Sequence, residues 1–207
     1  MTIGEYSQTF RGKRVVNFSM GDTPAGGDVV YRLTQDYDSS ESQRELLDSL
    51  LSQIDPSTLE ALVIGAWSEA QEQSPAGYLD ALIEYRDRLP ALTALFVGDM
   101  TYEDCEISWI IQTSYNALLA AYPKLQALRI RGSSELQLQA FQHDALEELA
   151  IECGGLPSSI VEAIAGSTLT MARAVEFVVS VVGREVGEAA IMAATTPARW
   201  HHPDEVG

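Results

Sequence analysis

Four short segments along the chain repeat one arrangement of apolar positions. Each has an apolar residue, a second one three positions later, and a β-branched residue two positions after that, soon followed by glycine. The segments are LEALVIG from Leu59, LTALFVG from Leu92, LQALRIRG from Leu125 and LEELAIECG from Leu146. The first three begin 33 residues apart, and the fourth begins 21 residues after the third. Four ordered copies with such spacing indicate a repeat architecture.

Each repeated segment predicts a short strand with one buried face. Side chains alternate along a strand, so Leu62 and Ile64 face one way, whereas Ala61, Val63 and Gly65 face the other. The leading leucine is expected to enter the same core from the preceding turn. Because such a strand cannot bury its leucines alone, the four segments are expected to stack as neighbouring parallel strands of one solenoid.

Helix-length segments separate the predicted strands. Apolar residues at helical spacing predict helices over 78–86, 115–122 and 157–166. Pro90 and Pro123 follow the first two helices closely, which is typical of a helix end. These segments are expected to cover the side of the sheet that carries the leucines.

The remaining segments predict a cap and a short return. Residues 41–54 predict an amphipathic helix with Ser40 as its N-cap, and residues 10–33 predict two or three short strands around a Gly- and Asp-rich loop. This part is expected to cap the first repeat, since solenoid ends expose apolar core. The 21-residue interval is too short for a full repeat, so residues 136–141 are expected to be extended or to form a single turn.

The strand pattern resembles the leucine-rich repeat, LxxLxLxxN/CxL. More narrowly, residues 10–168 resemble an uncharacterised family of stand-alone bacterial leucine-rich-repeat proteins, most specifically in the stretch CEISWIIQ (105–112). The resemblance implies an interaction role and an α/β fold. That fold would be an irregular leucine-rich-repeat solenoid, with parallel strands on the concave face, helices on the convex face and an N-terminal β/α cap. The expected organisation is a cap over 1–55, the repeat array over 56–168 and a divergent tail or cap over 169–207.

The repeats depart from the consensus at its asparagine position. That position, eight residues after the leading leucine, holds Trp67, Met100, Ser133 and Gly154. The consensus side chain hydrogen-bonds the neighbouring turn, so these turns must satisfy their backbone groups in other ways. The solenoid is therefore expected to be irregular, with Trp67 and Trp109 packing into the space that the missing asparagines leave.

Leucine usage changes abruptly near the end of the sequence. Residues 1–166 contain 21 leucines, whereas residues 167–207 contain one. Two interpretations remain open: the tail is a divergent cap helix and strand, or it is not original repeat sequence and arose from a reading-frame change or a recombined end. Without a proper cap, the last strand would leave an edge through which a second copy could pair, giving a homo-oligomer.

Composition restricts the classes of partner. Lys and Arg number 13 and Asp and Glu number 30, so the net charge is −17. Nucleic acids and anionic membrane surfaces should repel such a chain. No apolar run reaches the length of about 18 residues needed for a transmembrane helix, and residues 1–14 lack the apolar stretch of a secretory signal. Two cysteines without a CxxC motif favour a cytoplasmic protein with reduced thiols.

The outward strand residues predict the partner-binding surface, because they line the concave face of a leucine-rich repeat. The predicted binding residues are Val63, Phe96, Arg129, Arg131, Glu148 and Glu152. The two arginines could recognise an acidic group of a partner. Alternatively, they could pair with the two glutamates on the next strand, which would be a structural role.

The loop over residues 99–112 holds four carboxylates within eight residues. They could bind a hard cation such as calcium, but they lack the Asp-x-Asp-x-Asp-Gly register, so a solvated acidic loop is expected. Trp109 in the same loop is expected to pack. No GxSxG, GxGxxG, P-loop or HExxH motif occurs, and we predict no catalytic residue, no cofactor and no metal site.

The leading hypothesis is therefore a cytoplasmic, non-enzymatic scaffold that binds another protein, of unknown identity, through its concave face. An alternative is an acidic inhibitor or immunity-type protein that masks a basic surface, whose affinity would fall steeply with ionic strength. An enzyme is the least favoured class, because it would need a deep pocket with convergent titratable groups.

Overall fold

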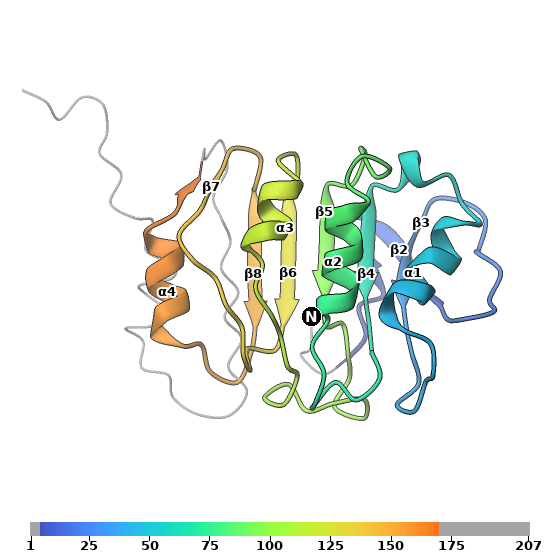
Figure 1. The fold of residues 1–207 in the computed structure, drawn as a ribbon, viewed down its shortest axis with the longest axis horizontal. Coiled ribbons are helices and arrows are strands. Elements are labelled where there is room, and N and C mark those ends of the chain that lie inside the picture. Colours follow the sequence, from blue (N-terminus) through green and yellow to red (C-terminus); the bar gives the residue numbers. More distant parts are fainter. Residues whose placement is uncertain (1–4, 170–207) are drawn as a thin grey trace, which may run out of the picture.

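The structure is a computed structural model that describes residues 5–169 of the 207-residue chain. Seven strands form one curled sheet in the order β1-β2-β3-β4-β5-β6-β8 (Figure 1). Every neighbouring pair is parallel except β1 and β2, which are antiparallel. The strands are β1 (Thr9–Phe10), β2 (Lys13–Phe18), β3 (Val29–Leu33), β4 (Ala61–Ile64), β5 (Ala94–Val97), β6 (Ala127–Arg131) and β8 (Glu148–Glu152).

The four repeated segments form consecutive parallel strands, as their pattern predicts. Two rows of apolar residues run across these strands, and the members of each row are paired in register from strand to strand. Every residue of both rows is at most 2 % exposed. The rows are Leu62, Leu95, Leu128 and Leu149, and Ile64, Val97, Ile130 and Ile151. The repeated pattern thus becomes matching register in the sheet, even where the interval is 21 residues instead of 33, and one continuous core results.

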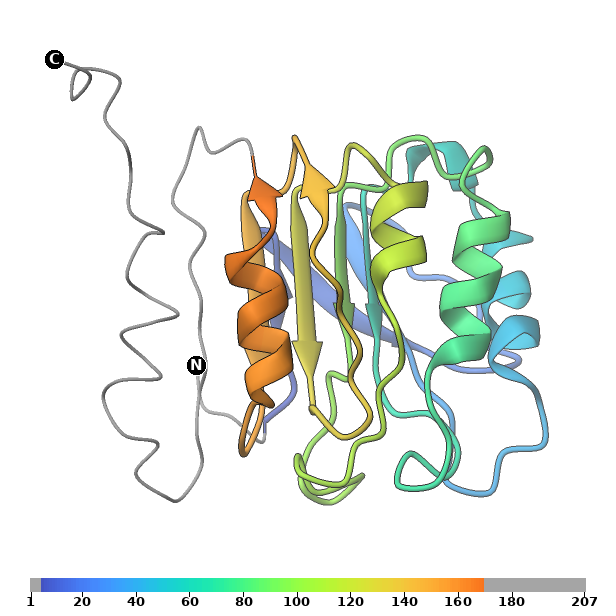
Figure 2. The same cartoon turned by 60° about the vertical axis from the view of Figure 1, so that its left-hand side comes forward.

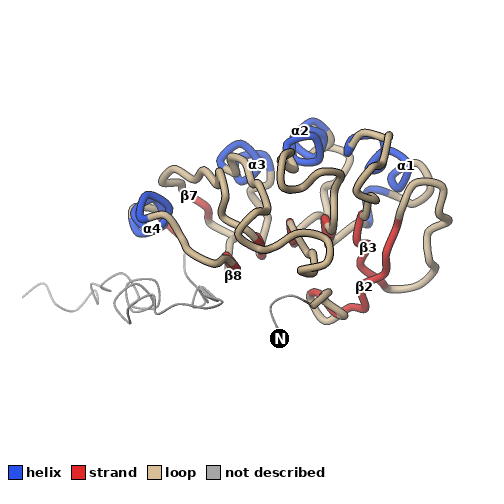
Figure 3. The backbone as a smooth tube through the Cα atoms, turned by 90° about the horizontal axis from the view of Figure 1, so that it is seen from below, coloured by secondary structure: helices blue, strands red, loops and turns tan. Residues whose placement is uncertain are grey.

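Four helices cover one face of the sheet (Figures 2 and 3). They are α1 (Gln43–Leu51), α2 (Ala76–Glu84), α3 (Asn116–Ala121) and α4 (Ser158–Ala165). The predicted helices are confirmed, with ends that differ by a few residues. The N-cap of α1 is Ser42 and not Ser40, because Ser42 and Glu45 form a reciprocal capping box at 2.8–3.2 Å. The return over residues 136–141 forms no helix and makes one isolated bridge, between Gln137 and Ser114. It leads into the short strand β7 (Gln142–His143), which pairs with β9 (Thr168–Leu169).

The N-terminal strands continue the repeat sheet. Val16 of β2 stands opposite Tyr31 of β3, which in turn stands opposite Leu62 of β4. Residues 5–10, called here the N-terminal segment, lie on the other side of the sheet from the helices (Figures 2 and 3). A tight turn at Arg11 and Gly12 connects this segment to β2.

A glutamine supplies part of the bonding that the missing asparagines would provide. The side-chain amide of Gln112 donates to the Arg131 carbonyl at 2.7 Å, and Tyr115 donates its hydroxyl to the Gln112 side-chain oxygen at 2.6 Å. Both side chains are buried. Trp67 packs in the core as expected, and its indole nitrogen donates to the Gln73 carbonyl at 2.8 Å.

We expect Gly98→Ala to destabilise the fold by about 1–3 kcal/mol. Gly98 has a φ of +91°, and a Cβ there would lie 2.6 Å from the Arg131 carbonyl oxygen, which belongs to the backbone and cannot move aside. Gly26→Ala is the matched control, since that glycine has no positive φ and its added Cβ would meet open space. Urea denaturation checks the difference, and equal midpoints for the two variants would contradict the argument.

Both cysteines are free and buried, in agreement with the expected reduced thiols. Burial raises the pKa of the Cys105 thiol to about 11. Among the described helices, none combines the length and the apolar character needed to cross a membrane. The expected divergent tail, except its first residue, lies outside the described residues.

Candidate functional site

The concave face of the sheet, opposite the helices, is covered over most of its width. Val63 and Phe96 are fully buried in a second apolar cluster with Phe10 of the N-terminal segment. The rings of Phe10 and Phe96 lie 6.1 Å apart. Three small residues that stand in register make room for this packing: Ala61, Ala94 and Ala127. The expectation that Val63 and Phe96 line an open surface is therefore wrong.

Four buried charged residues lie near the carboxyl ends of the parallel strands, next to the N-terminal segment. Arg32, Asp99, Arg131 and Glu152 are each at most 5 % exposed. Arg32 contacts the Asp99 carboxylate at 2.6–2.8 Å, and Arg131 contacts Glu152 at 2.8 Å and Asp99 at 3.4 Å. Two cations and two anions make this cluster neutral, and mutual pairing offsets the cost of burying them.

The N-terminal segment adds hydrogen bonds to this cluster. The Ser7 amide donates to both Asp99 carboxylate oxygens at 3.2 Å, and Arg32 donates to the Ser7 carbonyl at 2.5 Å. Tyr6 lies with its ring 4.7 Å from the Arg32 guanidinium and donates its hydroxyl to Asp104 at 2.7 Å. Partial burial, reinforced by the Asp104 carboxylate, raises the pKa of Tyr6 to about 12, so this contact persists through neutral pH.

The two predicted arginines pair with the two predicted glutamates. Arg131 bonds Glu152, and Arg129 contacts Glu148 at 2.9 Å and Glu152 at 3.8 Å. The predicted pairing of the two arginines with the glutamates on the next strand is confirmed. Arg129 and Glu148 are the half-buried members of the set, whereas Arg131 and Glu152 are buried. Recognition of a partner by these residues stays a prediction.

The loop over residues 99–112 matches the expected solvated acidic loop only in part, at the exposed Glu103 and Glu106. Asp99 is buried with the arginines, and Asp104 accepts bonds from the Thr101 amide and hydroxyl at 2.7 and 3.0 Å. Trp109 does not pack as expected, because 60 % of it is exposed. Tyr102 is 72 % exposed. Within residues 5–169, no group of three or more His, Cys, Asp or Glu side chains is arranged to hold a metal ion.

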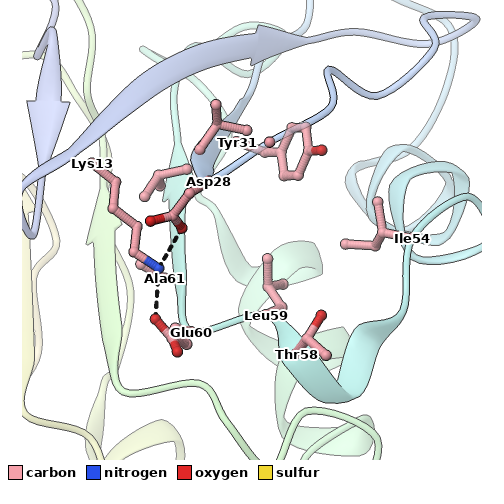
Figure 4. A pocket seen from close by; sticks show the side chains of 11 residues that line it. Lys13, Asp28, Tyr31, Ile54, Thr58, Leu59, Glu60 and Ala61 are labelled. Atoms are coloured by element: carbon pink, nitrogen blue, oxygen red, sulfur yellow. Dashed lines mark hydrogen bonds and ion pairs between the residues drawn. The ribbon is translucent and has the colours of Figure 1, made fainter.

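Two cavities lie outside this region. One of about 300 Å³ lies at the opposite end of β3 and β4, where Lys13 contacts Asp28 at 2.8 Å and Glu60 at 2.6 Å (Figure 4). Hydrogen bonds to these two carboxylates raise the pKa of Lys13, so its charge is retained and paired. A second cavity of about 670 Å³, lined mostly by polar side chains, adjoins the first turns of α1 and α2. Neither cavity adjoins the buried charged cluster.

The sequence interpretation missed both Arg32 and the N-terminal segment. The apolar residues Val63 and Phe96 on the outward face were a usable signal that this face is covered. Parallel sheets are usually buried on both faces, so large apolar residues there are not expected to face water. The aligned alanines were a second signal, since small residues in register leave a shallow groove. No pattern in EYSQTF itself indicates where that segment packs.

No family model matches the chain, and no curated protein does. A crystal structure of a structural-genomics target from Bacteroides fragilis is similar, with a TM-score of 0.62 and 30 % sequence identity. The similarity covers 75 % of this chain and 44 % of that one. The chain thus spans less than half the length of that protein. A TM-score of this size shows that the two proteins share a fold over the matched part.

Proposed function

We propose that the chain is a leucine-rich-repeat protein of the stand-alone bacterial type and that it binds another protein without catalysing a reaction. The LxxLxL strands in register, with helices along one face, support this repeat class. The two free, buried thiols support a cytoplasmic location. The charged groups near the carboxyl ends of the strands bind one another, which favours a structural role over a catalytic one for them.

The exposed aromatic residues of the 99–112 loop carry this proposal. Tyr102 and Trp109 are largely exposed although their loop is anchored, since Asp104 bonds Thr101 and the Ile111 amide donates to the Ala70 carbonyl at 3.0 Å. Aromatic residues on a fixed loop offer contact area at little cost in conformational entropy. Aromatic residues that become buried when two proteins bind are frequent hot spots of the interface.

Affinity capture from the host cell lysate tests the proposal. A Tyr102→Ala/Trp109→Ala variant should lose a protein that the wild-type chain retains, with affinity lower by at least about tenfold, as expected for hot-spot truncation. Tyr37→Ala is the matched control, because Tyr37 is 59 % exposed on a different loop. Equal retention by all three chains would contradict a binding role for this loop.

The acidic character of the same loop favours a second candidate, an inhibitor that masks a basic surface. Glu103 and Glu106 are exposed between the two aromatic residues in the sequence, and the whole chain carries a net charge of −17. A masking protein should bind through long-range attraction that salt screens. Retention that falls steeply between low and high ionic strength would favour this candidate over a general scaffold.

A further inference from the structure

The N-terminal segment packs on a part of the concave side that is called the groove here. Its contact residues are Arg32, Phe96, Asp99, Asp104 and Arg131. Asp99 accepts from the Ser7 amide at 3.2 Å, and Arg32 donates to the Ser7 carbonyl at 2.5 Å. Both polar groups of one peptide residue are thus bound by side chains of the sheet. Main-chain bonding of this kind is how proteins bind extended peptides with tolerance for sequence.

Two aromatic side chains, four positions apart, anchor the segment on either side of these bonds. Tyr6 donates to Asp104 at 2.7 Å and stacks against the Arg32 guanidinium at 4.7 Å. Phe10 packs 6.1 Å from Phe96, over the row of aligned alanines. The groove therefore combines two aromatic positions with a central main-chain contact.

Among the described residues, one buried polar group of the segment and one of the groove make no hydrogen bond. The Ser7 hydroxyl is buried and makes no hydrogen bond with any described residue. Arg131 donates through one terminal nitrogen to the Glu5 carbonyl at 3.4 Å, while its other terminal nitrogen is buried without an acceptor. Buried polar groups are normally bonded, so the groove has donor capacity that residues 5–10 leave unused.

The connection of the segment to the sheet is slight. Strand β1 has two residues, and it pairs with β2 through a turn in which Arg11 has a φ of +51°. A positive φ is uncommon for a residue other than glycine, so an arginine at this position makes the turn less stable than a glycine would. Retention of the segment therefore depends mostly on the groove.

We infer that this groove is a docking site for an extended segment of a partner protein and that residues 5–10 occupy it in cis. The partner segment carries aromatic residues four positions apart and a free main-chain N–H directly after the first of them. It also supplies an acceptor for the unused Arg131 nitrogen. This inference rests on the proposed function, but it concerns a different surface from the Tyr102 and Trp109 loop.

The full-length Ser7→Pro variant tests the inference, because proline removes the N–H that Asp99 binds and leaves the groove unchanged. Ser7→Ala is the matched control, since it keeps that N–H and removes a hydroxyl that makes no hydrogen bond. The probe is a fluorescent peptide with the sequence GEYSQTFR of residues 4–11. By fluorescence anisotropy, Ser7→Pro should bind it at least about tenfold more tightly than the wild type or Ser7→Ala, as expected when a cis competitor is removed. A peptide with alanine at both aromatic positions should not bind.

Equal peptide affinity for Ser7→Pro and the wild type, with an unchanged far-ultraviolet circular dichroism spectrum, would overturn the inference. Hydrogen exchange of the wild-type chain gives a second measurement that needs no variant. The Ser7 amide should exchange at least about tenfold faster than the Leu128 amide in the centre of the sheet, because the segment opens locally. Equal rates would show a permanently closed groove. A wild-type dimer that Ser7→Pro abolishes would assign the groove to a second copy and overturn the partner assignment. All these outcomes are independent of the Tyr102 and Trp109 variants.

Discussion

Asp99→Ala is expected to lower the free energy of unfolding by about 3–5 kcal/mol, the usual cost of breaking a buried ion pair from one side. The Asp99 carboxylate is 0 % exposed and lies between the guanidinium groups of Arg32 and Arg131, at 2.6 and 3.4 Å. Its removal takes away the carboxylate that Arg32 contacts and leaves Arg131 with Glu152 as its carboxylate partner in the cluster. It also frees the Ser7 amide, so the N-terminal segment loses its central contact.

Urea denaturation measures this effect, and Glu103→Ala supplies its control. Glu103 is an exposed carboxylate in the same loop, so removing it should change the free energy of unfolding by no more than about 0.5 kcal/mol. If Asp99→Ala cost less than about 1 kcal/mol, in the range of an exposed pair, the cluster would not be the buried network described above.

The sheet could be predicted from the sequence because its core is built from a local, repeated pattern. Leucines at fixed offsets determine which side of each strand is buried, and burying them side by side determines the register. The same logic predicted the helices that follow β4, β5 and β8. It also predicted that residues 136–141 would not form a helix, since the interval is too short to hold one.

The covered concave face could not be predicted in the same way, because it depends on contacts between distant parts of the chain. Ser7 lies 92 positions from Asp99, and Arg131 lies 126 positions from Glu5. Nothing in the local pattern around either residue specifies such a pairing. The exposure of Trp109 also depends on the path of an irregular loop, for which periodicity gives no information.

For the two arginines, the sequence spacing predicted the ion pairs but not whether their face of the sheet is open. The alternation placed Arg129 and Arg131 on the outward face, and the register then placed Glu148 and Glu152 within reach. Whether that face was open to a partner depended on the N-terminal segment. A prediction from strands alone treats the face as solvent, and the burial of Phe96 shows that this assumption fails.

Leu95→Ala should lower the free energy of unfolding by about 2–5 kcal/mol, the typical loss when a buried leucine is truncated and leaves a cavity. Leu95 is fully buried on β5 and stands in register between Leu62 and Leu128, so its loss weakens the packing on both neighbouring strands. Leu156→Ala removes the same atoms from a half-buried site and should cost about 1 kcal/mol. Leu95→Met, which nearly conserves volume, should cost less than about 1.5 kcal/mol. Thermal and urea unfolding should show the largest loss of stability for Leu95→Ala if the aligned leucines of the sheet stabilise the fold. Equal losses at Leu95 and Leu156 would mean that the stability of the fold does not depend on these leucines.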